Sequence, residues 1–176
     1  MSVSAVVYSV PPSKLLGAIG SKDAALKRAL ELGQDPQSRA LAALIDGQPQ
    51  PAKRSAATVI YGFERLCAHL GRSFGCNFSP TDVDLLDKID AELKGRGLPL
   101  SLSRLIYGPP PVPLPPPDDF PTVGHIEAAR IQAAFAALPP DGLSSDDPRI
   151  DAVLFDLCEW LTIAAARKDM LVGFSY

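Results

Sequence analysis

The sequence contains few of the residues on which most catalytic and metal sites are built. Its 176 residues include three cysteines, two histidines and one tryptophan. The cysteines, Cys67, Cys76 and Cys158, are odd in number and are not spaced as a disulfide framework or a zinc knuckle. We therefore expect reduced thiols that are mostly buried as small apolar residues, and we expect neither a metal site nor a cofactor.

Long apolar runs and the common motifs of enzymes are also missing. The longest wholly apolar runs, such as Ala5–Tyr8, fall far short of the roughly eighteen residues of a membrane span. The first basic residue is Lys14, which follows two prolines, so the start of the chain does not resemble a secretory signal. There is no Walker loop, Gly-rich dinucleotide fingerprint, nucleophile elbow or zinc-protease helix. We expect a cytoplasmic protein without identifiable catalytic residues, for which an enzymatic role stays open but is less favoured.

Charge is distributed unevenly along the chain. Residues 1–54 carry seven basic and four acidic groups, residues 55–108 carry six of each, and residues 109–176 carry four basic and ten acidic groups. No basic stripe with interleaved aromatic residues is present, so nucleic-acid binding is disfavoured. The acidic last third could present a negative face to a basic partner, although solvated helix surfaces explain the same charges.

Proline is the residue most concentrated in one place. Eight of the eighteen prolines fall between Pro109 and Pro121. No helix or central strand can form there, because each proline removes a backbone donor and fixes φ. The nearest downstream charges, Asp118 and Asp119, are acidic, whereas ligands of SH3 domains usually carry a basic residue beside the PxxP core. We therefore predict that residues 108–121 form a surface strut.

Strand and helix signals predict an α+β fold, predominantly helical, in a single domain over residues 1–176. Val3–Val10 and Met170–Tyr176 are rich in β-branched and aromatic residues, and we expect these terminal strands to pair in one small antiparallel sheet. Capping and stop signals predict helices between them, over about residues 21–32, 35–46, 55–70, 79–94, 126–138 and 147–167, with a short helical turn at 101–107. The last helix carries apolar residues on two faces, which predicts a central position for it, with Trp160 in the core.

One helix face gathers polar side chains that suit an anion. On the helix predicted over residues 55–70, Tyr61, Arg65, His69 and, if the helix continues, Arg72 align opposite the apolar stripe. Arginine forks and imidazole rings donate to carboxylates and phosphates. This face is either a binding site for an anion or small molecule, or an ordinary solvated helix surface.

A second group follows the proline-rich segment. Asp118, Asp119 and His125 flank Phe120 and Pro121, and a nearby carboxylate can orient a histidine ring. Catalysis would also need a nucleophile or a metal, and neither is identifiable in the sequence. In the structural interpretation, Phe120 fills the core and His125 helps to begin the next helix.

The proline-rich segment and the motif after it resemble an uncharacterised bacterial family of small intracellular proteins. The likeness lies at Tyr107–Pro115 and at Asp118–His125, which reads DDFPTVGH. It extends to Val6–Val10, Phe63–Cys67 and Asp169–Phe174, and so covers most of the chain through short motifs. The resemblance implies a shared fold and no catalytic residues.

Together these features favour a non-enzymatic protein-binding module of the bacterial cytoplasm, of an immunity or regulatory kind, whose partner has a basic surface. Neither a nucleic acid nor a membrane is expected as a partner. Two alternatives remain open. One is a small-molecule or anion-binding protein, or an enzyme, that uses the face of Tyr61, Arg65 and His69; the other is a structural subunit or homo-oligomer.

Overall fold

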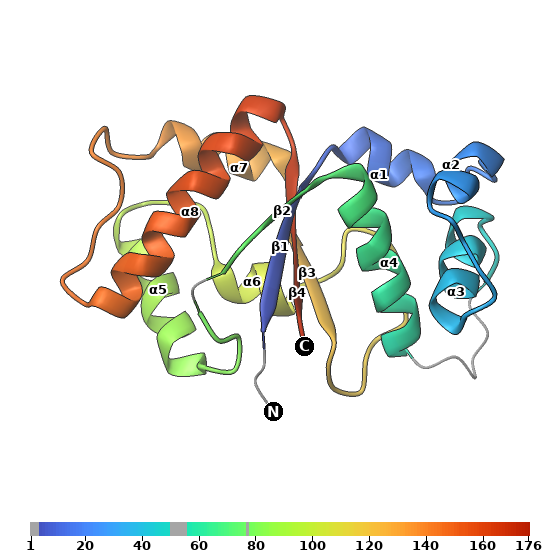
Figure 1. Ribbon diagram of the computed structural model, residues 1–176. Helices are drawn as coiled ribbons and strands as arrows, with labels where there is room; N and C mark the ends of the chain where they lie inside the picture. Colours follow the sequence, from blue (N-terminus) through green and yellow to red (C-terminus); the bar gives the residue numbers. More distant parts are fainter. Residues whose placement is uncertain (1–3, 50–55, 77) are drawn as a thin grey trace.

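The computed structural model describes residues 4–49, 56–76 and 78–176. Within these ranges, four strands form one antiparallel sheet in the order β2-β1-β4-β3. The strands are β1 (Ala5–Val10), β2 (Arg72–Phe74), β3 (Thr122–Ile126) and β4 (Met170–Ser175). Figure 1 shows the sheet between two groups of helices.

The two predicted terminal strands form the centre of the sheet. β1 pairs with β4 along its whole length, from Ala5 opposite Ser175 to Val10 opposite Met170. This pairing confirms the predicted fold class, an α+β fold in which the terminal strands share an antiparallel sheet. β2 and β3, which were not predicted, each add one edge strand.

Eight helices in the described residues cover the two faces of the sheet (Figure 1). One side carries α1 (Pro12–Ala18), α2 (Ala24–Ala29), α3 (Pro36–Ile45) and α4 (Ala56–Leu70). The other side carries α5 (Val83–Gly95), α6 (Leu102–Tyr107), α7 (Ala128–Ala136) and α8 (Pro148–Arg167). No helix in the described ranges has both the length and the apolar character needed to cross a membrane.

Because successive side chains of a strand point to opposite faces, the sheet separates two hydrophobic cores. Leu171 of β4 packs into the core formed with α5–α8. Met170, Val172 and Phe174 of the same strand pack into the core formed with α1–α4. Both cores therefore depend on β4.

α8 does not lie at the centre of the molecule as predicted, because the sheet occupies that place and α8 covers one of its faces. Trp160 of α8 is 1% exposed, which confirms its predicted place in the core. It stacks on Phe74 of β2 with 6.2 Å between ring centroids. Phe155, on the outward face of α8, is 71% exposed. Of the two apolar faces of α8, the one with Trp160 is therefore buried, whereas the one with Phe155 is exposed.

Aspartates set the beginnings of several helices. Asp35 and Asp147 cap α3 and α8 as predicted, and each is followed by proline in the first turn. α2 begins after Asp23 rather than at Ser21, because the Asp23 carboxylate accepts from two backbone N–H groups. α5 likewise begins after Asp82 rather than at Ser79–Pro80. The predicted starts at Val3 and Ser55 lie outside the described residues.

The segment after the prolines also differs from the prediction. The start of the helix predicted over residues 126–138 is replaced by β3, in which His125 lies opposite Val172. His125 therefore does not begin a helix, since α7 starts only after Glu127. Phe120 does not fill the core. It is 37% exposed, because it lies in the loop between the acidic pair and the sheet.

Two glycines allow α6 to lie directly on the sheet. Gly124 of β3 and Gly173 of β4 are opposite each other in the ladder. A Cβ atom at Gly124 would lie 2.5 Å from the Arg104 carbonyl oxygen, and one at Gly173 would lie 2.6 Å from the Leu105 carbonyl oxygen. The backbone of α6 thus occupies the space that side chains would need.

The proline-rich segment connects α6 on one face of the sheet with the edge strand β3. Val112 is buried and Leu114 partly buried, and both pack into the α1–α4 core. The segment therefore passes around the β3 edge of the sheet. Its acidic end, Asp118–Phe120, is exposed.

Candidate functional site

The residues predicted on the polar face of α4 have different surroundings in the structure. The ring of Tyr61 stacks on Tyr176, with 5.7 Å between centroids and planes 1° apart. His69 is exposed near the end of α4. Arg72 already belongs to β2, where its guanidinium lies 5.7 Å from the centroid of the Phe74 ring. These side chains do not gather around one pocket.

Arg65 joins α4 to the end of α2 and the start of α3. Its guanidinium donates to Ser38 Oγ at 3.0 Å, to the Leu30 carbonyl, and to the Glu31 carbonyl at 3.3 Å. Leu30 is the C-cap of α2, so Arg65 satisfies a carbonyl near the end of that helix. Because the guanidinium of Arg65 already donates to these partners, fewer of its N–H groups can bind an anion.

We expect Arg65→Ala to lower the free energy of unfolding by about 1–3 kcal/mol, because hydrogen bonds from a charged group are lost. Arg65→Lys should recover only part of this loss, since an ammonium group cannot present a planar fork. Chemical denaturation measures both values. An unchanged denaturation midpoint in the alanine variant would show that this linkage does not stabilise the fold.

The second predicted group is also divided. His125 Nδ1 donates to the Pro109 carbonyl at 2.7 Å, and its Nε2 lies 3.8 Å from Glu127 Oε1. In the part of the chain that the structure describes, no hydrogen bond or ion pair joins Asp118–Phe120 to His125. The acidic pair and the histidine therefore do not form the acid–base arrangement that the sequence allowed.

Glu127, which was not predicted as a site residue, is the centre of a charged cluster. Its Oε1 accepts from Arg104 Nη2 at 3.0 Å, and its Oε2 lies 3.8 Å from Arg130 Nε. The pKa of Glu127 is lowered, chiefly by a hydrogen bond with its own backbone N–H and further by the positive charge of Arg104, while burial opposes the shift. The cluster links α6, β3 and the start of α7, which indicates a structural role.

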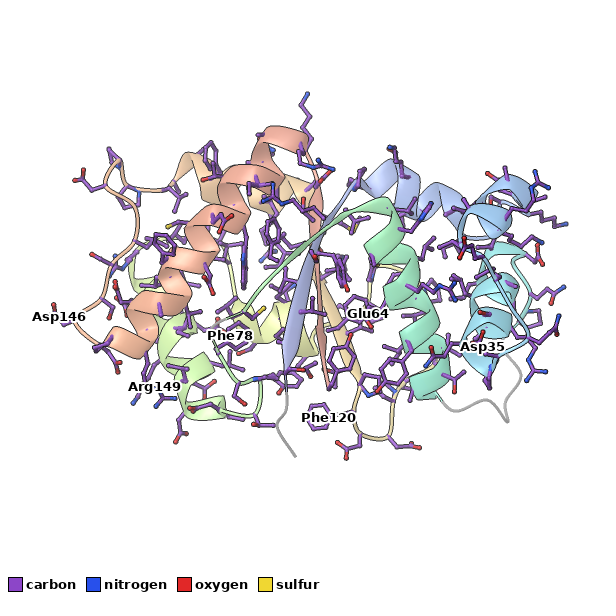
Figure 2. All side chains as sticks on the ribbon, in the orientation of Figure 1. Asp35, Glu64, Phe78, Phe120, Asp146 and Arg149 are labelled. Carbon is purple, nitrogen blue, oxygen red and sulfur yellow. The ribbon has the colours of Figure 1, made fainter. Side chains whose placement is uncertain are left out.

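A carboxylate and two phenols meet between α4 and the sheet. Tyr8 donates to Glu64 Oε1 at 2.9 Å, and the Tyr176 hydroxyl is buried near the same carboxylate. Figure 2 shows Glu64 between α4 and the strands. Burial raises the pKa of Tyr8 and of Tyr176, and the negative charge of Glu64 raises both further.

We expect the protein to lose stability as the pH rises above about 10, where the phenols of the unfolded chain ionise. In the folded state Tyr8 and Tyr176 have a raised pKa and keep their protons, so their stabilising contribution is complete below that pH and declines above it. Denaturation midpoints measured against pH test this, together with the ultraviolet absorbance of the phenolates. Tyr8→Phe should reduce the alkaline decline, and an identical decline in that variant would contradict the assignment.

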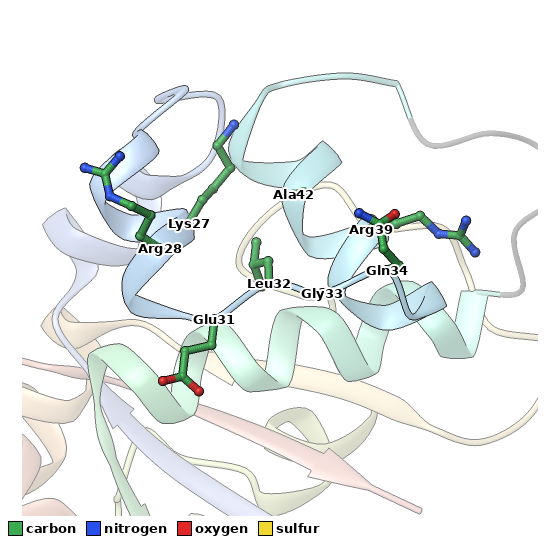
Figure 3. Close-up of a pocket in the computed structure, with 8 residues that line it drawn as sticks. All are labelled: Lys27, Arg28, Glu31, Leu32, Gly33, Gln34, Arg39 and Ala42. Atoms are coloured by element: carbon green, nitrogen blue, oxygen red, sulfur yellow. The ribbon is translucent and has the colours of Figure 1, made fainter.

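A hollow of about 450 Å³ lies between α2 and α3. Lys27, Arg28 and Arg39 line it together with Glu31. Figure 3 shows the charged ends of these side chains pointing away from one another. Lys27 also forms an ion pair with Asp46, with 2.7 Å between the charged atoms. The hollow thus lacks the converging donors that an anion site needs.

A second hollow, of about 400 Å³, lies between β2 and α8. One wall is formed by Arg72–Cys76 and the other by Asp156, Glu159 and Trp160. Burial, followed by the negative charge of Asp156, raises the pKa of Cys76 to about 12. A thiol that stays protonated is a poor nucleophile, so Cys76 is not activated for covalent chemistry. No three His, Cys, Asp or Glu side chains in the described ranges are placed to hold a metal ion.

Next to this hollow, α8 exposes an aromatic ring. Phe155 is the most exposed large hydrophobic side chain in the described part of the chain. Asp151 and Glu159 lie four residues before and after it, and therefore on the same helix face. We call Asp151, Phe155 and Glu159 the α8 surface. Aromatic residues are enriched at protein interfaces, although single exposed apolar side chains are also common on protein surfaces.

Of the predicted site residues, only Arg72 lines the hollow beside α8. Phe155, Asp156 and Glu159 were not among them. Two acids lie four residues on either side of Phe155 in the sequence, but periodicity alone favours burial for an apolar residue, so this pattern did not indicate an exposed ring.

The fold and these surfaces define an α+β protein whose antiparallel sheet is covered by helices on both faces and whose edge strand borders a polar hollow. The chain belongs to the family described as Domain of unknown function (DUF7691), which matches it over residues 1–176. Comparison with curated proteins and with solved structures gave no match.

Proposed function

We propose that this chain is a non-enzymatic protein-binding module that docks a partner with a basic surface on the α8 surface. The observation that carries the proposal is Phe155, which is 71% exposed between Asp151 and Glu159. Aromatic side chains supply much of the binding free energy at protein interfaces. Acidic neighbours select positively charged partners and speed their association.

The charges around α8 support a basic partner. Residues 141–167, which form the loop before α8 and α8 itself, carry six acidic and two basic groups. Asp141, Asp146 and Asp147 are exposed in the loop that leads into α8, and Figure 2 shows Asp146 at the outer edge of the molecule. Attraction between exposed charges is screened by salt, so binding should weaken as salt is added. The proline-rich segment and the motif after it resemble a bacterial family of small intracellular proteins, which favours a bacterial cytoplasm as the place where this module acts.

We expect a pull-down from the native host to recover a partner whose capture decreases with salt and is lost when Phe155 is replaced by serine. Loss of a central aromatic contact should weaken binding about tenfold or more. Leu16→Ser is the matched control, because Leu16 is also an exposed apolar residue but lies on α1, across the sheet.

Circular dichroism should show that both variants fold like the original chain. Equal capture by all three proteins would contradict the proposal. So would a partner that is retained equally at low and moderate salt.

A further inference from the structure

We infer that the partner supplies an extended segment that adds to the free edge of β2 as a fifth strand and places a lysine or arginine side chain in the hollow beside α8. This inference rests on the proposed function, since it specifies which part of the partner meets this region. The partner would be recognised through the backbone of its extended segment and through the positive charge of one side chain.

β2 is a short edge strand. Its three residues pair with Val7–Ser9 of β1, and no other described strand lies on its far side. Arg72 and Ser73 are exposed. Figure 1 shows β2 crossing in front of β1 with no helix drawn over it. The backbone groups at such an edge readily pair with an extended segment of another chain.

The geometry of β2 determines which side chains of an added strand would reach the hollow. Phe74 packs against Trp160, and Arg72 lies over the same Phe74 ring, so both side chains are on the α8 side of the sheet. Every second side chain of an added strand would face that side as well. Those side chains would enter the hollow in which Asp156 and Glu159 form the opposite wall. A cation is favoured next to Phe74 rather than opposite Arg72, where like charges would meet.

The hollow matches a single basic side chain in size and in charge. Its volume of about 400 Å³ accommodates the long stem of a lysine or arginine. Glu159 is exposed on the wall of the hollow, so its carboxylate can meet a basic side chain there. A three-residue strand offers few main-chain hydrogen bonds, and so Phe155, one turn from Glu159, would supply the remaining contact with a full partner.

The probe is a pentapeptide of alternating threonine and valine with lysine at its centre. Trp160 is the only tryptophan of the chain and forms part of the wall of the hollow, so its fluorescence reports binding. We expect a saturable change in this fluorescence and slower amide hydrogen exchange within Arg72–Phe74. The same peptide with alternate backbone nitrogens methylated should bind about tenfold more weakly or worse, because it cannot pair with the edge.

The matched variant is Glu159→Lys, which reverses one charge at an exposed position. Its affinity for the lysine peptide should fall about tenfold or more, and its affinity for a peptide with central glutamate should rise. Three results would each overturn the inference: no fluorescence change with the lysine peptide, equal binding of the methylated peptide, or equal affinity of Glu159→Lys and the original chain. A partner that depends on Phe155 alongside any of these results would leave the proposed function intact and overturn strand addition alone.

Discussion

Replacing Gly173 with alanine is expected to lower the free energy of unfolding by about 3 kcal/mol or more, or to prevent folding. The new Cβ atom would lie 2.6 Å from the Leu105 carbonyl oxygen and 3.0 Å from its Cγ atom. The carbonyl belongs to the backbone of α6, so relief requires the whole helix to move away from β3 and β4. Chemical denaturation followed by circular dichroism measures the effect.

Two further substitutions test this explanation. Gly17→Ala on α1 is the matched control, because a Cβ atom there meets nothing within 4 Å. It should be neutral or stabilise the protein by up to about 1 kcal/mol, since alanine favours the helix. Gly124→Ala should resemble Gly173→Ala, and the double variant should lose less than the sum, because both new atoms displace the same helix. Normal stability of Gly173→Ala would show that α6 does not need this close approach.

Trp160→Ala is expected to cost about 3–5 kcal/mol, as for other large aromatic side chains removed from a core. The indole is almost fully buried and stacks on Phe74, with 26° between the ring planes. Its loss leaves a cavity between α8 and β2 that the surrounding side chains only partly fill. Thermal or chemical unfolding must be followed by circular dichroism, because this variant has no tryptophan fluorescence.

Phe155→Ala provides the control on the same helix. Its ring is mostly in solvent, so its removal should change stability by no more than about 0.5 kcal/mol. The two variants therefore compare the contributions of the inward and outward faces of α8 to stability. If Phe155→Ala were as unstable as Trp160→Ala, Phe155 would belong to the core, and the proposed binding surface would be wrong.

The fold class could be predicted from the sequence because its signals are local. β-branched and aromatic residues mark β1 and β4, and Asp35 and Asp147 with their following prolines mark the starts of α3 and α8. β2 and β3 could not be predicted in the same way. They have three and five residues, and their strand conformation comes from pairing with β1 and β4, far away in the sequence.

The candidate site was less predictable for a related reason. A helical projection places Tyr61, Arg65 and His69 on one face, but it does not show what packs against that face. Arg65 donates to the end of α2 and to the start of α3, and Tyr61 stacks on Tyr176. The same limit applies to Phe155, since the apolar pattern of α8 does not show which of its faces meets the sheet.

The central place of β4 also determines when this chain can fold during its synthesis. β4 lies between β1 and β3 and contributes side chains to both cores, so neither core can close before residues 170–175 have left the ribosome. Pairing strands from opposite ends of a chain gives a high contact order, which slows folding. Until then part of the apolar surface that β4 covers stays exposed, which makes a nascent chain prone to aggregate.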